Sequence, residues 1–200
     1  MASRGELSAA RKNQILDAAM VVFARSGFHE ARMDDIVQES GLSKGTLYWY
    51  FKSKEEIITA ISQRLFATDI ESVESLLNAE GTVSERLQQL IRDRVQGLQE
   101  MSDVVAILVE FYAAALHQDG VRQLIKAYFQ NFYELLVALI EQGIERGEFR
   151  PVDALAAATA LDAVFEGLIV RWLIDPDALQ WASLGEAAIR FMLDGLKHRQ

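Results

Sequence analysis

Helix-breaking residues are rare and widely spaced in this chain, and this constrains its fold more than any other feature of the sequence. Two prolines and 12 glycines occur in 200 residues. The long stretches between them repeat apolar residues at helical spacing, which predicts helices rather than the frequent turns of a small all-β domain. Half of the residues are hydrophobic, so the chain can bury a real core. We therefore expect an all-α protein.

Composition excludes several classes of protein and of site. The chain has no cysteine, so disulfide scaffolds, thiolate zinc sites and cysteine nucleophiles are ruled out. Its longest apolar runs, such as 104–109 and 135–140, have six residues, whereas a membrane-spanning helix needs about 20. The N-terminal sequence is polar and lacks the apolar core of a signal peptide. We expect a cytoplasmic protein with no membrane partner.

The distribution of charge divides the chain in two. Residues 1–54 contain eight Lys or Arg and six Asp or Glu, whereas residues 55–200 contain 12 and 23, so net charges of +2 and -11 make up the total of -9. Within the front end, residues 43–54 carry three lysines and no acidic residue, which gives a local positive field. The sequence therefore predicts a small basic domain over 1–54 joined to a larger acidic domain over 55–200.

Nine helices are predicted from apolar periodicity and capping signals. The first runs from Ser8 to Gly27, and two short helices over 33–40 and 44–50 are joined by a turn containing Gly41, which is typical of a helix-turn-helix. The remaining helices are expected over 53–78, 82–101, 103–117, 119–146, 152–174 and 177–197. The fourth would be about 36 Å long, enough to connect the two domains. The expected N-caps are Ser43, Ser53 with Glu56, and Thr82 with Glu85.

The segment GLSKGTLYWYFKSKEE, residues 41–56, resembles the tetracycline-repressor-like (TetR) family of bacterial transcriptional regulators. A looser match to the family covers EGLIVRWLIDPDAL, residues 166–179. The upstream positions that also fit are Ala18, Ala19, Phe23, Gly27, Phe28, Asp35 and Ile36. The resemblance implies a three-helix DNA-binding head on an all-α body that dimerises and binds a small-molecule effector. It also implies the function of a ligand-responsive repressor bound to a palindromic operator.

The third predicted helix carries residue types suited to contact with DNA. Gly45 has no side chain, so the amino end of the helix can approach phosphates, toward which the positive end of the helix dipole points. Ser43 and Lys44 add a hydroxyl and a cation at the same end. Thr46 offers a hydroxyl and a methyl to base edges in the major groove. The residues expected to pack inward, against Phe23 and Ile36, are Leu42, Leu47 and Phe51.

Three consecutive aromatic residues follow, and at least one must face outward because they fan over about 200° of the helix. By resemblance, Tyr48 and Trp49 contact bases or the sugar-phosphate backbone, Tyr50 donates to a phosphate, and Lys54 neutralises another. Arg32 stands where many family members have a capping Ser or Thr, and it offers a phosphate contact of its own. The alternative is that the lysines form a solvated face and the aromatics only pack. An acid-free run of lysines beside three aromatics disfavours it.

The helices predicted over 152–174 and 177–197 are the expected dimer interface. The run DALAAATALDAVFEGLIV is rich in alanine, which permits close helix approach, and has more apolar positions than one helix face needs. A four-helix bundle between two subunits would bury the excess, and a dimer would read two half-sites. The predicted interface residues are Ala157, Leu161, Val164, Leu168, Ile189 and Leu193. The alternative is that both helices are buried within one subunit.

Aromatic and carboxylate residues of the body predict a cavity for a small-molecule effector. Carboxylates beside aromatic rings suit a cationic or amphiphilic ligand. The candidate residues are Glu110, Phe111, Tyr112, His117, Phe129, Phe132, Tyr133, Asp162, Phe165 and Glu166. Taken singly, an aromatic residue at helical spacing is more often part of a core, and an isolated glutamate often pairs with an arginine. The sequence leaves the identity of the effector open.

Two other functional classes are disfavoured. The three histidines, at positions 29, 117 and 198, form no H-E-x-x-H pair, and the sequence has no phosphate-binding glycine loop or GxSxG motif. We therefore predict no catalytic residue, no cofactor and no metal site. A helical scaffold or interaction protein that has lost operator binding is the remaining alternative, and the presence of Lys44, Gly45, Thr46, Tyr48 and Lys54 argues against it.

Overall fold

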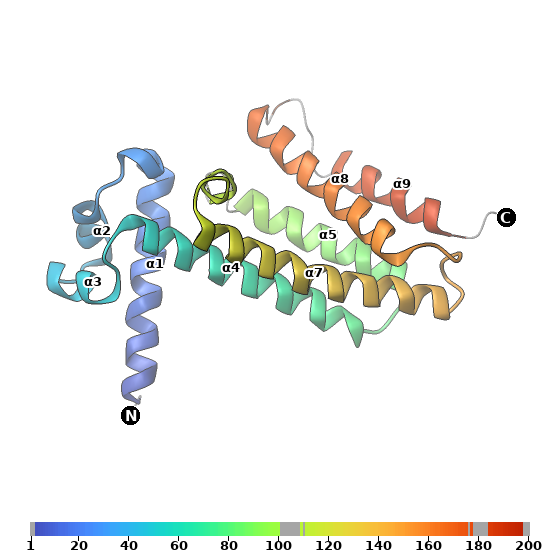
Figure 1. Cartoon of the computed structure of the whole chain (residues 1–200), viewed down its shortest axis with the longest axis horizontal. Coiled ribbons are helices and arrows are strands. Elements are labelled where there is room, and N and C mark those ends of the chain that lie inside the picture. The colour runs from blue at the N-terminus through green and yellow to red at the C-terminus, as the bar shows by residue number, and fades with distance from the viewer. Residues whose placement is uncertain (1–2, 101–108, 110, 176, 178–183, 198–200) are drawn as a thin grey trace. The chain divides into compact units, whose positions relative to one another are not determined.

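The structure, a computed structural model, describes residues 3–100, 109, 111–175, 177 and 184–197. The chain forms two compact units, which consist of Met1–Phe66 with Asp103–Leu124 and of Ala67–Ser102 with Ile125–Gln200. Figure 1 shows helices in both. Within the described residues, the extended pairing is limited to one isolated bridge between Phe149 and Lys197. The predicted all-α fold is confirmed.

The first unit contains the helix-turn-helix. Its elements are α1 (Arg4–Glu30), α2 (Met33–Ser40), α3 (Lys44–Tyr50), the first turns of α4 (Lys54–Leu77), and helical residues at 109 and 111–115. The short helices α2 and α3 lie beside the longer α1 (Figure 1). Its core is formed by Ile15, Ala19, Val22, Phe23, Ile36, Leu47, Phe51, Ile57 and Ile61. The predicted inward position of Leu47 and Phe51 is therefore confirmed, and Leu42 packs against the same cluster.

The observed ends of α1 differ from those predicted from apolar periodicity. The helix begins at Arg4 rather than at the predicted Ser8, because Ser3 and Glu6 form a capping box with Ser3 Oγ 3.2 Å from the Glu6 nitrogen. These first turns are mostly exposed, so no apolar pattern marks them. At the predicted stop, Gly27 leaves helical geometry with φ of 74°, a value that strains residues other than glycine. Helical residues continue past this kink, so α1 ends at Glu30 and not at Gly27.

The turn between α2 and α3 is fixed by local chemistry. Gly41 adopts a left-handed conformation, with φ of 66°, and ends α2. Ser43 then caps α3 by accepting a hydrogen bond from the Thr46 backbone N–H at 3.1 Å. Both features were predicted. The helix-turn-helix is therefore specified by residues within one short segment.

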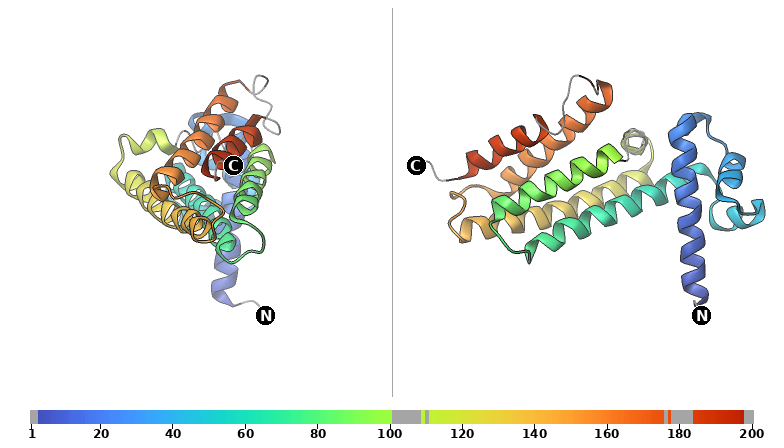
Figure 2. Two further views of the ribbon diagram at one scale, coloured as in Figure 1. Left: turned by 90° about the vertical axis from the view of Figure 1, so that its right-hand side faces the viewer. Right: turned by 180° about the vertical axis from the view of Figure 1, so that it is seen from behind.

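The second unit is a packed set of helices. It contains the remainder of α4, α5 (Val83–Glu100), most of α7 (Asp119–Glu145), α8 (Ala154–Ile174) and α9 (Glu186–Leu196). Helix α9 contacts both α5 and α8, as the two views of Figure 2 show. The buried core includes Leu87, Leu90, Phe132, Leu136, Leu139, Ile140, Phe149, Leu161, Phe165, Ile189 and Leu193.

Most predicted helix ends in this unit are confirmed within a few residues. Thr82 and Glu85 cap α5 through reciprocal hydrogen bonds of 2.9 and 3.1 Å. Asp153 caps α8 by accepting from the Ala156 N–H at 3.0 Å, so the helix begins at Ala154 and not at residue 152. Residues 103–108 and 110 of the helix predicted over 103–117, and residues 178–183 of the last predicted helix, lie outside the described residues. Eight helices have defined bounds, and the helical residues at 109 and 111–115 account for the ninth.

Candidate functional site

The amino end of α3 presents a small polar surface. Ser43, Lys44 and Gly45 are exposed and Thr46 is half-buried. The Ser43 and Thr46 hydroxyls lie 2.8 Å apart, so the cap orders both. A methyl group at Gly45 would meet only Ser43 Oγ, at 3.9 Å. The fold therefore does not require glycine at this position, and the space in front of its backbone is open to another molecule.

The three consecutive aromatic residues of α3 differ in exposure, because they point in different directions around the helix. Trp49 is 70% exposed and packs edge-on against Tyr50, with ring centroids 4.6 Å apart. Tyr48 and Tyr50 are half-buried and pack against the core of the unit. The Tyr50 hydroxyl donates to Ser8 Oγ at 3.3 Å, which ties α3 to the first turns of α1. The prediction that one of the three faces outward is confirmed by Trp49.

Each of the three lysines near α3 has a partner within the unit. Lys44 Nζ lies 2.7 Å from Asp34 Oδ1, and this hydrogen bond raises the pKa of Lys44. Lys52 Nζ donates to the Tyr48 carbonyl at the end of α3. Lys54 Nζ donates to the carbonyls of Phe28, His29 and Ala31 at 2.7, 2.7 and 3.3 Å. Lys54 thus uses its three N–H donors to close the carboxyl end of α1.

The start of α2 differs from the capped arrangement that the family implies. Arg32 is exposed, and its side chain makes no capping hydrogen bond. Asp35 instead accepts a hydrogen bond from the Arg32 backbone N–H at 3.0 Å. The Arg32 guanidinium therefore extends from the amino end of α2 without serving the helix itself.

The residues predicted to line an effector cavity fall in both compact units. Phe111 is buried in the first unit, where its ring centroid lies 6.0 Å from that of Phe66. Tyr112, half-buried, and His117, exposed, belong to the same unit, and Glu110 lies outside the described residues. The members in the second unit are Phe129, Phe132, Tyr133, Asp162, Phe165 and Glu166.

A charged cluster is buried in the second unit. Arg94 of α5 pairs with Asp69 of α4 through two hydrogen bonds, of which the one from Nε to Oδ1 measures 2.7 Å. Their side chains are only 15% and 19% exposed. The Tyr128 hydroxyl of α7 donates to Asp69 Oδ2 at 2.5 Å. The Arg94 guanidinium also lies over the rings of Phe132 and Phe165, 4.7 and 5.0 Å from their centroids. Burial disfavours its charge, but Asp69 outweighs this and raises the pKa of Arg94.

A second buried carboxylate lies near this cluster. Asp162 of α8 is 5% exposed and accepts a hydrogen bond from the Tyr133 hydroxyl at 2.9 Å. Burial raises the pKa of Asp162, because desolvation outweighs the opposing effects of Tyr133 and Arg94. Burial and the bond to Asp162 also raise the pKa of Tyr133. The phenol therefore stays protonated, as a donor to Asp162.

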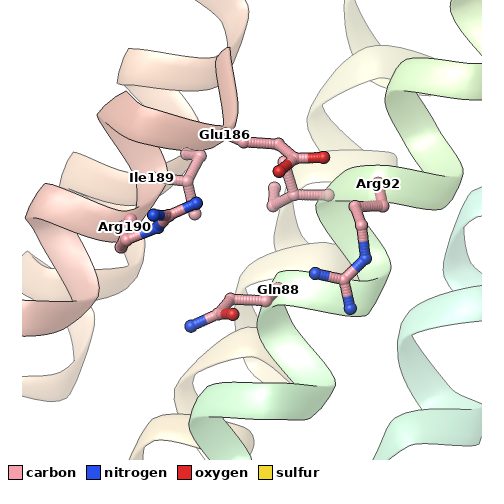
Figure 3. A pocket seen from close by; sticks show the side chains of 6 residues that line it. Gln88, Arg92, Glu186, Ile189 and Arg190 are labelled. Atoms are coloured by element: carbon pink, nitrogen blue, oxygen red, sulfur yellow. The ribbon is translucent and has the colours of Figure 1, made fainter. Parts of the chain in front are cut away.

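The described part of this unit includes two small cavities of about 20 Å³ each. One is lined by apolar residues of α5, α7, α8 and α9 together with Arg94 and Asp162. Three predicted residues, Phe132, Asp162 and Phe165, contribute to its wall. The other lies between α5 and α9, where Gln88, Arg92, Glu186 and Arg190 face one another (Figure 3).

In the described part of the chain, no helix is both long and apolar enough to cross a bilayer. Those same residues contain no group of three or more His, Asp or Glu side chains arranged to hold a metal ion.

Comparisons with known proteins identify the family. Residues 15–61 match the family model described as bacterial regulatory proteins, tetR family, and residues 83–197 match that of the BetI-type transcriptional repressor, C-terminal. The chain is 31% identical over 147 residues to the HTH-type transcriptional regulator YfiR of Bacillus subtilis, covering 73% of this chain and 71% of that protein. The chain belongs to the TetR family. It is thus a DNA-binding transcriptional regulator and not an enzyme.

Other relatives and solved structures agree with this TetR-family assignment. The fatty acid metabolism regulator protein of B. subtilis is 24% identical over 189 residues, covering 93% of this chain and 95% of that protein. The structure of B. subtilis FadR with stearoyl-CoA superposes with a TM-score of 0.77 at 23% identity, covering 92% and 98% of the two chains. A regulator from Saccharomonospora viridis in complex with choline gives 0.79 at 23% identity, covering 96% and 100%. These superpositions show the fold.

The predicted dimer residues of this TetR-family regulator lie mainly on the inner side of α8 and α9. Leu161, Ile189 and Leu193 belong to the core of the second unit. Ala157, Val164 and Leu168 are half-buried against that core. The large apolar residues on the outer side of the same helices are Leu155, Val170, Ile174 and Phe191, with exposed fractions of 48–79%. Helix α8 is therefore apolar on two sides, whereas the exposed side of α9 carries Phe191 between charged residues.

Asp69 and Arg94 of this TetR-family regulator form the centre of the buried cluster, although the sequence did not predict either as a candidate site residue. Arg94 follows Leu87, Leu90 and Ile91 at helical spacing, on the face that packs into the core. The position of Arg94 in the sequence could have indicated a buried ion pair, because a charged residue at a core position is seldom left unpaired. Its partner, 25 residues earlier on another helix, had no such signal.

Proposed function

We propose that this regulator is a homodimeric, ligand-responsive repressor that binds a palindromic operator. DNA binding is assigned to residues 1–54, and ligand binding with dimerisation to residues 55–200. The observation that carries the proposal is the exposed surface of α3, in which a capped amino end, an open backbone and an outward tryptophan stand together within the segment that matches the family. The proposed place of action is the cytoplasm, where the operator is accessible.

Each exposed residue of this surface has a proposed role. Ser43, Lys44 and the Gly45 backbone bind phosphates, while Thr46 and Trp49 reach base edges or the sugar-phosphate backbone in the major groove. The residues proposed to make further DNA contacts at or near α3 are Arg32, Tyr48, Tyr50 and Lys54. Lys54 acts through its charge, because its donors already hold three carbonyls of α1.

The dimer would bury the outer faces of α8 and α9. Along α8 the exposed positions Leu155, Thr159, Ala163 and Gly167 follow one another at intervals of four residues and continue to Val170 and Ile174. Small residues in this row permit close helix approach, and Phe191 of α9 is 77% exposed. The residues predicted from the sequence, Ala157, Val164 and Leu168, would border this surface.

Sedimentation tests the dimer. The wild-type chain at micromolar concentration should sediment as a dimer, and Phe191→Asp with Val170→Asp should sediment as a folded monomer. Lys126→Asp, an exposed change on α7, serves as the control and should stay dimeric. A monomeric wild-type chain would refute the proposal.

The effector would act through α4. This single helix carries Lys54 near the head and Asp69 in the buried cluster of the second unit. A ligand that repacks the second unit would displace α4 and change the separation of the two recognition helices. Half-sites lie about 34 Å apart, so a shift of a few ångström would prevent simultaneous docking.

Retardation of DNA tests the function. A palindromic fragment from the region beside the gene should be retarded at physiological salt, and a scrambled fragment of equal composition should not. Thr46→Ala should narrow the difference between the two fragments, whereas Lys44→Gln should weaken binding to both. Equal retardation of both fragments by the wild-type chain would show that the protein does not read sequence through this surface.

A further inference from the structure

Two acidic side chains act on the same buried arginine in the second unit, one from α4 and one from α8. We propose that the Arg94 guanidinium exchanges between these acids, Asp69 of α4 and Asp162 of α8, and that its choice of partner holds or releases α4. Arg94 is thus a positioning residue for this helix. The inference rests on the proposed function, because it is through α4 that an effector would act on the DNA-binding head.

The two acids have matching hydrogen bonds from α7. The Tyr128 hydroxyl donates to Asp69 Oδ2 at 2.5 Å. Further along the same helix, the Tyr133 hydroxyl donates to Asp162 Oδ2 at 2.9 Å. Each acid therefore has a tyrosine donor of its own, and the difference between them is that Arg94 donates to both oxygens of Asp69. Transfer of the guanidinium to Asp162 would keep both tyrosine bonds and exchange one ion pair for another.

Both acids influence the charge of Arg94. Burial lowers the pKa of Arg94, but attraction by Asp69 and, less strongly, by Asp162 outweighs burial and raises it. Burial raises the pKa of Asp162, and the Arg94 charge opposes that rise. One cation cannot neutralise two carboxylates in a desolvated site, so whichever acid is not paired keeps an uncompensated charge. The cluster therefore has two alternative pairings with the same total charge, as a two-state element requires.

Aromatic rings provide a path between the two acids. The guanidinium lies over Phe132 and Phe165, 4.7 and 5.0 Å from their centroids. Phe165 follows Asp162 on α8 at helical spacing, and both line a small cavity of about 20 Å³. Arg94 and Phe132 line the same cavity. The guanidinium can therefore cross the rings into this free space and keep its attraction to their faces while it changes partner.

The two pairings connect different helices. In the structure, Arg94 joins α5 to Asp69 of α4 with two hydrogen bonds. Pairing with Asp162 would instead join α5 to α8 and leave Asp69 with the hydrogen bond from Tyr128. Because hydrogen bonds between charged groups are stronger than those of neutral donors, α4 would then be held less firmly. Exchange of a single side chain would therefore change the restraint on α4 in the second unit.

Crystal structures of two variants would show the partner of Arg94 directly. Asp69→Asn removes the charge of the present partner, so Arg94 should lie within hydrogen-bonding distance of the Asp162 carboxylate, about 3 Å. In Asp162→Asn the guanidinium should keep both hydrogen bonds to Asp69. Asp153→Asn is the matched control, because it removes a charge at the N-cap of the same helix as Asp162 and asparagine also caps helices. In this control Arg94 should not move.

Urea unfolding of the full-length protein measures the same competition in solution. In the wild type, Asp162 is the acid without the arginine, so Asp162→Asn should raise the urea midpoint at neutral pH. Once Asp69→Asn has transferred Arg94 to Asp162, adding Asp162→Asn should lower the midpoint, because it breaks the new pair. The effect of one substitution thus reverses its sign between two backgrounds. Asp153→Asn should shift the midpoint equally in both.

Two isosteric variants test the effect on α4 and leave every charge in place. Tyr133→Phe removes the donor of Asp162 and should draw Arg94 toward this acid, which releases α4. Tyr128→Phe removes the donor of Asp69 and should keep Arg94 where it is. Operator affinity, measured by fluorescence anisotropy, should therefore change by at least about threefold in Tyr133→Phe and by less in Tyr128→Phe. Simple loss of a contact with α4 predicts the opposite order, since Tyr128 bonds to α4 and Tyr133 to α8.

Three results would overturn the inference: an Arg94 that stays beside the substituted side chain in Asp69→Asn, a midpoint shift by Asp162→Asn in the same direction in both backgrounds, or an effect of Tyr128→Phe on operator affinity as large as that of Tyr133→Phe. The tyrosine variants decide the question should Asp69→Asn fail to fold. Operator retardation by the wild-type chain reports the proposed function separately. Retardation without exchange of Arg94 refutes only this inference, whereas exchange of Arg94 in a chain that retards no DNA refutes the proposed function.

Discussion

The proposed DNA-binding surface and the buried cluster of the second unit contain the same kinds of charged pair in opposite surroundings. Lys44 and Asp34 are exposed, with side chains 62% and 67% accessible, whereas Arg94 and Asp69 are 15% and 19% accessible. Water screens the first pair, so its partners exchange readily for other ions such as phosphates. The second pair is desolvated, and loss of either partner leaves a buried charge. Exposed pairs thus suit reversible contact with DNA, and buried pairs hold the arrangement of helices.

The largest effect is expected from breaking the buried pair. Asp69→Asn leaves the Arg94 guanidinium without its counterion, which should lower the free energy of unfolding by about 3 kcal/mol. Urea unfolding followed by circular dichroism measures this. Combining Asp69→Asn with Arg94→Met removes both charges and should restore much of the loss. If the single and the double variants were equally unstable, the cost would come from packing and not from the unpaired charge.

A smaller effect, on DNA binding alone, is expected at Gly45. Because an added methyl group would meet only Ser43 Oγ at 3.9 Å, Gly45→Ala should leave the thermal midpoint unchanged or slightly raised. The same methyl group would stand between the α3 backbone and a phosphate, so operator affinity should fall by about tenfold. Fluorescence anisotropy with labelled operator gives the affinity. Unchanged affinity would place the phosphate contact elsewhere on the head.

Stability near the buried carboxylate should depend on pH. Groups on three other helices, Tyr133, Arg94 and Asp69, influence Asp162, and burial sets the direction by raising its pKa above the ordinary value of 3.8. The folded state then binds this proton more tightly than the unfolded state, so stability falls as pH rises through the interval between the two pKa values. Asp162→Asn lacks this titration and should be more stable than wild type by about 1 kcal/mol at neutral pH.

Thermal melts at several pH values check this prediction. The advantage of Asp162→Asn over wild type should be complete above the raised pKa and disappear below about pH 4. Asp153→Asn, at an exposed helix cap, should show no such trend. An advantage of Asp162→Asn that did not change with pH would mean that ionisation of the carboxylate is not its cause.

The two regions also differ in how far the sequence predicts them. The helix-turn-helix depends on Gly41, Ser43, Leu47 and Phe51, which lie within a short segment where capping and periodicity act locally, and all four have the predicted roles. Lys54 shows the limit of local reasoning, because its three carbonyl partners belong to residues 23–26 positions earlier. Contacts made by folding a long side chain back onto another helix leave no periodic signal.

In the second unit two of the predicted aromatic residues, Phe132 and Phe165, contribute to a cavity wall together with Asp162, but the charged residues around them come from different helices. Asp69, Arg94, Tyr128 and Asp162 belong to α4, α5, α7 and α8 in turn. Periodicity places each on an inner face without indicating which inner residues meet. Side-chain packing across four helices therefore determines this site. The exposed row of α8 that begins at Leu155 could likewise be recognised only from the structure, because the sequence does not show which apolar face of the helix is buried in the core.

The smallest effect is expected from the exposed pair at the head. Asp34→Asn removes the carboxylate that now holds Lys44 at 2.7 Å, so the ammonium becomes available to a phosphate and one repulsive charge leaves the proposed DNA-binding surface. Affinity for the operator should rise by about threefold at low salt, and the gain should shrink as ionic strength increases. The urea midpoint should not change, since the pair is exposed.

Anisotropy titrations at two salt concentrations compare this variant with Lys44→Gln, which should lose affinity and lower the salt slope by about one. If Asp34→Asn weakened binding instead, the Asp34–Lys44 pair would be orienting the lysine for DNA, and exposed pairs on this surface would resemble the buried cluster in fixing geometry.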